Sequence, residues 1–395
     1  MLTAVAFLVA LPATLVFTIY AVEVAAGLRP LKGRGAAGGC PRTVILVPAH
    51  NEAAAIAGTV DALREHLPST ASILVVADNC ADDTASRARE AGARVVERHD
   101  PGRRGKGYAL AFGRDALIAD PPRCVVVLDA DCRMEPGGVE RIARACVAWG
   151  APVQSCNLLR GDTRQPVMVQ ISNFAFLIKN LIRQQGMARL GKTAVLTGTG
   201  MAIPWAPFRT APLATGDIVE DLGLGILLTR AGWRPRFLPT VRTWSDPAAR
   251  GDMLAQRSRW EGGFLATARR RALPLIRSGL AQRSRPELWL GMHLLVPPLA
   301  LLFALGSAIA VVTAMLGWAG AGWWPVAMLG GAGGVAAALT LIAWMRVGRN
   351  VLAPTALLQI PFYVLFKIPI YLRLLRGSPG EWNRTRRVGE DVPGR

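Results

Sequence analysis

Two carboxylate side chains follow a strongly apolar stretch near position 125. Residues 125–128 read Val-Val-Val-Leu, and Asp129 and Asp131 come directly after them. Four apolar residues in a row suit a central strand of a parallel sheet, and such sheets bind ligands beyond the carboxyl ends of their strands. Close carboxylates repel each other unless they share a proton or a cation, so we expect a hard cation that bridges to phosphate oxygens. A solvated Asp-rich turn is the alternative interpretation.

Further polar side chains follow two other short apolar segments. Asp78 directly follows the apolar segment at residues 72–77. Residues 43–47 run into a polar turn whose members are Pro48, His50, Asn51 and Glu52. Because the carboxyl ends of parallel strands meet at one edge of a sheet, we expect these groups to lie where a nucleotide would bind.

A basic turn at residues 103–107 contains Lys106, whose ammonium group suits a phosphate. This turn is not a P-loop, because glycine rather than serine or threonine follows Lys106. The Gly-Thr-Gly sequence at 198–200 also lacks the last glycine of a dinucleotide-binding motif. The four histidines include no HExxH pair, so zinc-dependent hydrolysis has no support.

Strand and helix patterns alternate between residues 43 and 128. Strand-like segments lie at 43–47, 72–77, 94–97 and 124–128. Helical patterns lie at 53–67, at 83–91 and from the basic turn to residue 119. This alternation predicts an α/β fold with a doubly wound, mostly parallel sheet. We expect Asp82 or Asp83 to cap the second helix.

Three downstream segments are each open to two interpretations. Apolar residues at helical spacing over 167–182 predict a helix that either packs in the core or lies along a membrane. Glu220 and Asp221 precede a predicted helix at 222–231, where acids are commonly capping residues. A basic and aromatic cluster before a membrane span is typical of an interface anchor, and here it consists of Gln256, Arg257, Arg259 and Trp260.

Apolar residues make up 51% of the 395 residues, which is too many for an ordinary soluble enzyme. Residues 1–28 contain no basic residue, and Arg29 follows them. We therefore expect a retained transmembrane anchor rather than a cleaved signal peptide, with its C-terminal side in the cytosol. A cytosolic domain is expected over 41–275 and a membrane region over 286–375.

The C-terminal membrane region is predicted to contain spans at 288–318 and 323–344, each long enough to cross about 30 Å of hydrocarbon. Pro361, Lys367 and Pro369 interrupt the next apolar segment, residues 352–375. A fourth crossing there would export the arginines of the basic tail at 376–395. We therefore predict an interfacial or re-entrant helix and a cytosolic tail, with a plain fourth span as the alternative.

Net charge and cysteine content limit the partners. The formal charge of +19 comes without an RNA-binding signature or metal-finger spacing, so anionic lipid and nucleotide phosphates are expected partners and nucleic acid is not. The six cysteines form no CxxC pair, and all lie in the part of the chain expected in the cytosol, between the N-terminal anchor and the C-terminal membrane region. We expect them to be reduced.

Taken in order, these motifs resemble the membrane-bound family 2 glycosyltransferases, which include cellulose, chitin and hyaluronan synthases. The resemblance covers residues 43–265 and the membrane segments at both ends. It implies a GT-A-like fold, in which Asp129 and Asp131 form a DxD metal site for Mg²⁺ or Mn²⁺. It also implies that Asp221 is the base of a Glu-Asp pair and that residues 256–260 are a QxxRW motif.

The resemblance assigns the remaining site residues to the nucleotide. Asp78 and the turn at 48–52 would hold the base and ribose. Trp382, Thr385 and Arg387 in the tail resemble a Trp-x-x-Thr-x-Arg ending of such enzymes. The chain departs from the family where Asp-Asp-Gly-Ser is replaced by Ala-Asp-Asn-Cys at 77–80, and where Val219 replaces the threonine before the acidic pair.

The chemistry of sugar transfer fits these residues. Release of a nucleoside diphosphate requires neutralisation of its negative charge, which a metal ion at Asp129 and Asp131 would provide. Arg259 is expected to add bidentate contacts, and Arg257 or Lys106 further charge. Asp221 would take the proton of the acceptor hydroxyl in a single inverting displacement, and Glu220 is its partner. Trp260 and Gln256 would contact the acceptor.

The resemblance implies transfer of a hexose or N-acetylhexosamine from a UDP-sugar to a glycan acceptor. The expected role is exopolysaccharide synthesis at the cytosolic face of a bacterial inner membrane. Polysaccharide export partners remain open, because the long C-terminal channel of cellulose synthases has no counterpart here. A glycolipid synthase acting on a lipid acceptor is the alternative. An inactive nucleotide-sugar-binding scaffold and a transporter are more remote.

Overall fold

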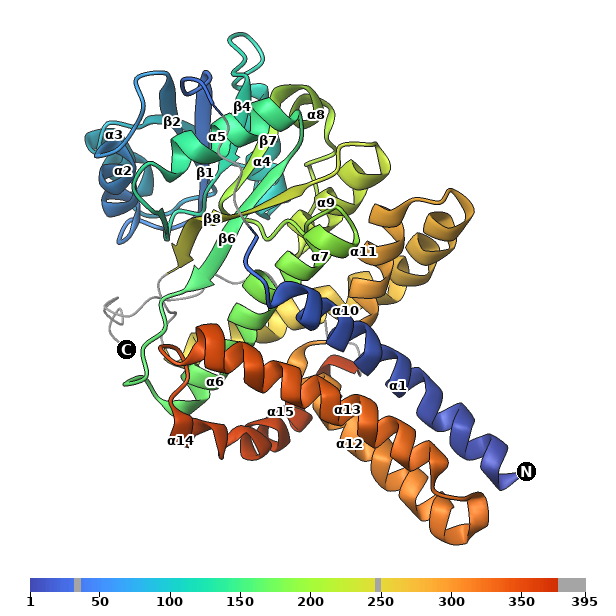
Figure 1. Ribbon diagram of the computed structural model, residues 1–395. Helices are drawn as coiled ribbons and strands as arrows, with labels where there is room; N and C mark the ends of the chain where they lie inside the picture. The colour runs from blue at the N-terminus through green and yellow to red at the C-terminus, as the bar shows by residue number, and fades with distance from the viewer. Residues whose placement is uncertain (32–36, 246–249, 376–395) are drawn as a thin grey trace. The chain divides into compact units, whose positions relative to one another are not determined.

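The computed structural model describes residues 1–31, 37–245 and 250–375, with side chains omitted at 250–255 and 374–375. The chain divides into two compact units (Figure 1). The first, called here the α/β unit, comprises Leu31–Arg160 and Lys192–Phe264. The second, called the helical unit, comprises Met1–Pro30, Gly161–Gly191 and the described part of Leu265–Pro379.

One mixed, mostly parallel sheet runs through the α/β unit, with the strand order β3-β2-β1-β4-β7-β6-β8-β5. The strands are β1 (Thr43–Ala49), β2 (Ala71–Asp78), β3 (Arg94–Arg98), β4 (Cys124–Val127), β5 (Cys132–Met134), β6 (Val153–Leu159), β7 (Met201–Pro204) and β8 (Arg236–Ser245). Strands β3, β2, β1 and β4 are parallel to one another, and β6 is parallel to β8. Strand β7 runs antiparallel to β4 and β6, and β5 runs antiparallel to β8. This confirms the expected α/β fold with its mostly parallel sheet.

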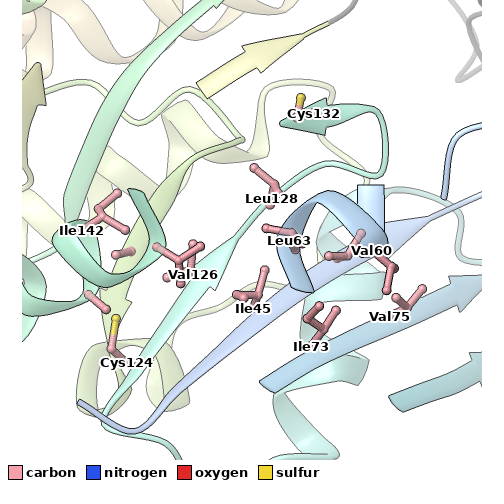
Figure 2. Close-up of a cluster of buried hydrophobic side chains, with 14 of the residues drawn as sticks. Ile45, Val60, Leu63, Ile73, Val75, Cys124, Val126, Leu128, Cys132 and Ile142 are labelled. Carbon is pink, nitrogen blue, oxygen red and sulfur yellow. The ribbon is translucent and has the colours of Figure 1, made fainter. Parts of the chain in front are cut away.

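Alternating side chains divide the core between the two faces of the sheet, because successive residues of a strand point to opposite sides. Ile45 and Val126 pack with α2 (Ile56–Arg64), α3 (Thr84–Glu90) and α5 (Gly138–Trp149) on one face (Figure 2). Leu46 and Val127 pack with residues of α4 (Lys106–Asp115), α8 (Trp205–Thr210) and α9 (Glu220–Arg230) on the other. Burying each such side chain contributes about 1.5–3 kcal/mol. Coverage on both faces explains why β4 is apolar at every position.

The helices that follow the first strands are shorter than their patterns predict. Helix α2 begins at Ile56 rather than at residue 53, because residues 53–55 form part of a turn in which the Ala53 amide donates to Asp82 Oδ2. Asp82 Oδ1 also accepts from the amide of Thr84, at 3.1 Å. Of the two capping candidates it is therefore Asp82 that satisfies a free amide of α3. Helix α4 ends at Asp115, four residues before the expected end.

Three helices of the helical unit are long and apolar enough to cross a membrane: Leu2–Gly27, Leu299–Ala321 and Trp324–Gly348. The first lies where the anchor was expected, and its role as a retained transmembrane anchor stays a prediction. The span expected at 288–318 differs, because the chain forms helix α11 (Arg285–Leu295), leaves it before two prolines and begins α12 only at Leu299. Proline lacks the amide that a helix interior requires, so the break falls there.

Residues 161–191 belong to the helical unit, so the expected continuous domain over 41–275 differs from the observed division. This segment forms α6 (Val167–Leu177), a π-helix (Ile178–Arg183) and α7 (Gln184–Leu190). Gly27 and Gly186 allow close backbone packing of this segment on α1 (Leu2–Gly27), where a Cβ would meet a carbonyl oxygen. Its apolar spacing therefore reflects packing within the unit that contains the apolar helices.

The last described elements are α14 (Pro354–Leu357) and α15 (Ile360–Leu375). Helix α15 is 16 residues long and exposes Phe362 and Leu365, while Lys367 and Tyr371 are buried. Its interfacial or re-entrant placement stays a prediction. The tail at 376–395, with Trp382, Thr385 and Arg387, lies outside the described residues.

Candidate active site

An acidic cluster lies just beyond the carboxyl end of β4. Oxygens of Asp129 and Asp131 and the sulfur of Cys132 all lie within 4.8 Å of one another. The thiol of Cys132 donates to Asp131 Oδ1 at 3.3 Å and contacts Ser245 Oγ at 3.0 Å. Burial, and then the charge of Asp129, raise the pKa of this thiol to about 12. The two half-buried carboxylates therefore fit a hard cation such as Mg²⁺ or Mn²⁺, whereas the thiol stays protonated.

Lys106 joins this cluster from the first residue of α4. Its Nζ donates to Asp129 Oδ1 and to the carbonyl oxygen of Gly198, the second at 2.8 Å. Glu220 Oε1 lies 4.0 Å from the same nitrogen. Burial lowers the pKa of Lys106, but the nearby carboxylates outweigh this and leave that pKa above its usual value. The ammonium group therefore stays charged among these acids.

Glu220 and Asp221 begin α9, which places them at the same edge of the sheet. Burial raises the pKa of Glu220 to about 8, the attraction of Lys106 opposes this, and the repulsion of Asp221 and Asp129 adds to it. Asp221 Oδ1 accepts from the Leu222 amide at 2.8 Å. Its other oxygen, Oδ2, lies 3.2 Å from the place that a Cβ at Gly198 would take, as does Lys106 Nζ. Glycine at 198, with φ +81°, thus keeps the space between Asp221 and Lys106 open.

The loop at 197–200 is fixed by side chains that the sequence alone did not single out. Thr199 Oγ1 accepts from the Asp129 amide at 3.0 Å. The fully buried Gln154 accepts from the Thr197 amide at 2.9 Å and donates to the Thr199 carbonyl at 2.9 Å. The available signal was the glutamine within the segment Val-Gln-Ser-Cys-Asn-Leu-Leu, which forms the buried strand β6, because a buried amide needs partners.

The turn at 48–52 and the end of β2 are brought together as expected. Pro48 lies within β1, and His50 Nδ1 lies 2.7 Å from the Asp78 carbonyl oxygen. Asn51, with φ +53°, accepts from the Ala81 amide at 2.7 Å. The amide of Glu52 donates to Thr84 Oγ1 at 2.8 Å. These bonds join the β1 turn to the β2 turn at the edge that also holds the acidic cluster.

Arg98 is a further residue that the sequence did not reveal. It ends β3 opposite Asp78, and its Nη1 donates to Asp78 Oδ1 at 2.6 Å. Its Nη2 donates to Asp100 Oδ2 at 2.9 Å, and its guanidinium lies over the ring of Tyr108. The Asp78 side chain is only 5% exposed in this pair. One carboxylate oxygen of Asp78 therefore anchors β3.

Gln256, Arg257, Arg259 and Trp260 lie on α10 (Arg250–Ala281). Arg257 is buried and Trp260 is partly exposed. A Cβ at Gly263 would touch Val219, the residue before the Glu-Asp pair. Residues three and four positions apart share a helix face, so Arg259 and Trp260 lie on the side of α10 that faces Val219. The substitution of valine for threonine at 219 thus forms a packing contact with this helix.

Comparison with known proteins identifies the family. The model of a family described as "Glycosyltransferase like family 2" matches residues 41–263. The chain belongs to this family. The match covers more than half of the chain and includes every site residue discussed above. Membership of glycosyltransferase family 2 is therefore confirmed, whereas the membrane-bound subtype that includes cellulose and chitin synthases stays a prediction.

Two known proteins, one compared by sequence and one by structure, are similar to this chain. A probable glycosyltransferase of Bacillus subtilis, YdaM, is 26% identical over 238 residues, or 56% of this chain and 55% of that protein. The chain thus spans about half the length of this curated relative. The mannosyltransferase PcManGT from Pyrobaculum calidifontis, solved with GDP-Man and Mn²⁺, is 17% identical with a TM-score of 0.54. This likeness covers 95% of this chain and 99% of that one, and it confirms the GT-A-like fold.

Proposed function

We propose that this family 2 protein is an inverting, metal-dependent glycosyltransferase that uses a UDP-sugar. The observation that supports this most directly is the arrangement around Gly198. The carboxylate of Asp221 and the ammonium of Lys106 border the same open space, and Lys106 in turn contacts Asp129. A candidate base and a candidate diphosphate site thus lie side by side, as the displacement of a nucleoside diphosphate by a hydroxyl requires.

Asp129 and Asp131 would hold Mg²⁺ or Mn²⁺, which when bound neutralises charge on the departing diphosphate. Lys106 and Arg259 add positive charge to the same group. Asp221 accepts the proton of the acceptor hydroxyl, while the raised pKa of Glu220 keeps that neighbour protonated near neutral pH. Asp221 is therefore the better candidate for the base of the pair.

The remaining assignments concern the substrates. Asp78 and the turn at 48–52 would bind the nucleoside, and Gln256 and Trp260 the acceptor. The three apolar helices support a membrane protein, and the basic residues after α1 support a cytosolic catalytic unit. We infer that the product is an exopolysaccharide made at the inner membrane from hexose or N-acetylhexosamine units.

The experiment is release of nucleoside diphosphate by the purified full chain in nanodiscs, with a panel of UDP-sugars, GDP-mannose and an extract of bacterial glycans and lipids. We expect release that requires Mn²⁺ or Mg²⁺, that stops with a chelator and that falls more than about a hundredfold in Asp131→Asn. Absence of release across the panel would favour the inactive scaffold. Mass spectrometry of the product separates a growing polymer from a lipid that carries one sugar.

A further inference from the structure

The position of Lys106 is not explained by a contact between its charge and the diphosphate of the donor alone. In the structure its ammonium group binds a carboxylate oxygen of the candidate metal site, Asp129 Oδ1. The Gly198 carbonyl accepts a second of its three protons. A divalent cation and this ammonium group would therefore compete for the same carboxylate oxygen.

The backbone around Lys106 is held in place, whereas its side chain has room to move. Gly105 has φ +135°, and a Cβ at Gly107 would collide with the carbonyl oxygens of Leu213 and Thr215. The side chain of Lys106 remains 20% exposed, and its four-carbon stem is flexible. The ammonium group can thus leave Asp129 by a change of rotamer while α4 stays in place.

The surrounding charges determine the direction of this exchange. Without a ligand, the charge of Lys106 offsets the negative charge of Asp129 and Asp221, which reduces the attraction of the site for a cation. A bound diphosphate adds negative charge, so that the site can then hold both the cation and the ammonium group of Lys106 favourably.

We propose that Lys106 is an exchangeable counter-ion of the metal site. It occupies Asp129 until the donor arrives and then moves to the diphosphate, so that a divalent cation binds well only together with the nucleotide. This inference rests on the proposed function, because it takes Asp129 and Asp131 as the metal ligands. It adds that one positive side chain weakens binding of the metal alone and strengthens binding of the metal with the donor.

The test is Mn²⁺ binding to the purified full chain, measured by electron paramagnetic resonance of the free ion with and without UDP. Removal of the charge in Lys106→Met should tighten Mn²⁺ binding without UDP by about tenfold, since a nearby like charge is lost from a partly exposed site. The same variant should weaken UDP binding in the presence of Mn²⁺. The enhancement of Mn²⁺ affinity by UDP should therefore shrink.

Three further variants control for charge and folding. Lys106→Gln removes the charge but keeps a polar side chain. It should show the affinities expected of Lys106→Met, and it replaces that variant if Lys106→Met folds poorly. Lys106→Arg keeps the charge and should leave Mn²⁺ affinity within about threefold of the unaltered protein. Lys192→Met makes the same substitution at an exposed lysine and should change neither affinity.

Two outcomes would overturn the inference, and they differ in what else they affect. If the unaltered protein binds Mn²⁺ more tightly with UDP but both uncharged variants retain its affinities, the role of Lys106 is wrong and the proposed metal site stands. If the unaltered protein binds no Mn²⁺ even with UDP or GDP, the metal site itself is wrong and the inference fails with it.

Discussion

At the scale of single residues, the candidate site is a balance between acids and one lysine. Lys106 contacts Asp129 and lies 4.0 Å from Glu220, so one ammonium group lies close to two of the acidic side chains. Burial of Glu220 disfavours its charged form, which leaves Asp221 as the member of the pair suited to accept a proton. We therefore propose different roles for the two neighbouring acids, because their surroundings differ.

This difference predicts a pH-dependent stability. The pKa of Glu220 lies near 8 in the folded chain and at its lower, ordinary value in the unfolded chain. The stability that Glu220 contributes is therefore fully present at low pH and is lost as the pH rises through 8. The variant Glu220→Gln cannot ionise at this position and does not show this loss. The difference in unfolding free energy, variant minus unaltered protein, should therefore increase by more than about 1 kcal/mol between pH 5 and pH 9.

The measurement is urea unfolding of both proteins, followed by tryptophan fluorescence in the presence of a chelator. A difference between the two proteins that stays constant across this pH range would contradict the environment assigned to Glu220.

At the scale of secondary structure, the strands and their polar ends could be predicted from the sequence. The apolar runs before Asp78 and before Asp129 are long enough for buried strands, and parallel pairing brings their ends to one edge. Hydrophobic periodicity carries this information locally. The acidic cluster at the end of β4 could therefore be found without coordinates.

Other parts of the site depend on contacts between distant segments. Arg98 and Asp78 are 20 residues apart, and only the pairing of β2 with β3 brings them together. Gln154 reaches the loop at 197–200 because β6 pairs with β7, an antiparallel arrangement that breaks the parallel pattern. No local pattern specifies which strands become neighbours, so these residues were missed.

The Arg98–Asp78 pair leads to a prediction about the stability of β3. Removing the guanidinium in Arg98→Met leaves a buried carboxylate poorly compensated, which should cost about 3–5 kcal/mol of unfolding free energy. The matched control is Arg89→Met, whose partner Glu97 is exposed, and there the cost should stay below about 1 kcal/mol. Urea unfolding of the purified variants measures both, and equal losses would show that burial of the Asp78 pair has no special weight.

At the scale of the whole molecule, the chain combines an α/β unit with a helical unit that is discontinuous in sequence. Residues 161–191 lie between candidate catalytic motifs in the sequence, yet they pack on α1 in the helical unit. Buried Glu23 of α1 accepts from Arg183 Nε at 2.7 Å, and His293 of α11 lies within 3.0 Å of the same carboxylate. This ion cluster joins residues more than 100 positions apart, and no local pattern in the sequence indicates such a contact. The sequence therefore predicts one continuous domain over 41–275.

The proposed orientation in the membrane predicts the reactivity of introduced cysteines. Ala319, which is exposed in the π-helix Gly317–Ala321 between α12 (Leu299–Leu316) and α13 (Trp324–Ala343), should face outside. Arg270 of α10 should face the cytosol. In intact cells, a membrane-impermeant maleimide should therefore label Ala319→Cys and should label Arg270→Cys only after permeabilisation. The unaltered chain, with its own cysteines in the α/β unit, serves as the blank. The reverse pattern would place the α/β unit on the outer side.

The central claim is that Asp221 is the base of a sugar transfer at the Asp129–Asp131 site. The most direct test compares Asp221→Asn with Asp217→Asn, the same change at an exposed aspartate four residues earlier. We predict that Asp221→Asn lowers turnover by about a hundredfold or more and keeps UDP affinity within about threefold, while Asp217→Asn retains both. Turnover that survives in Asp221→Asn, or loss of nucleotide binding together with turnover, would contradict the assignment.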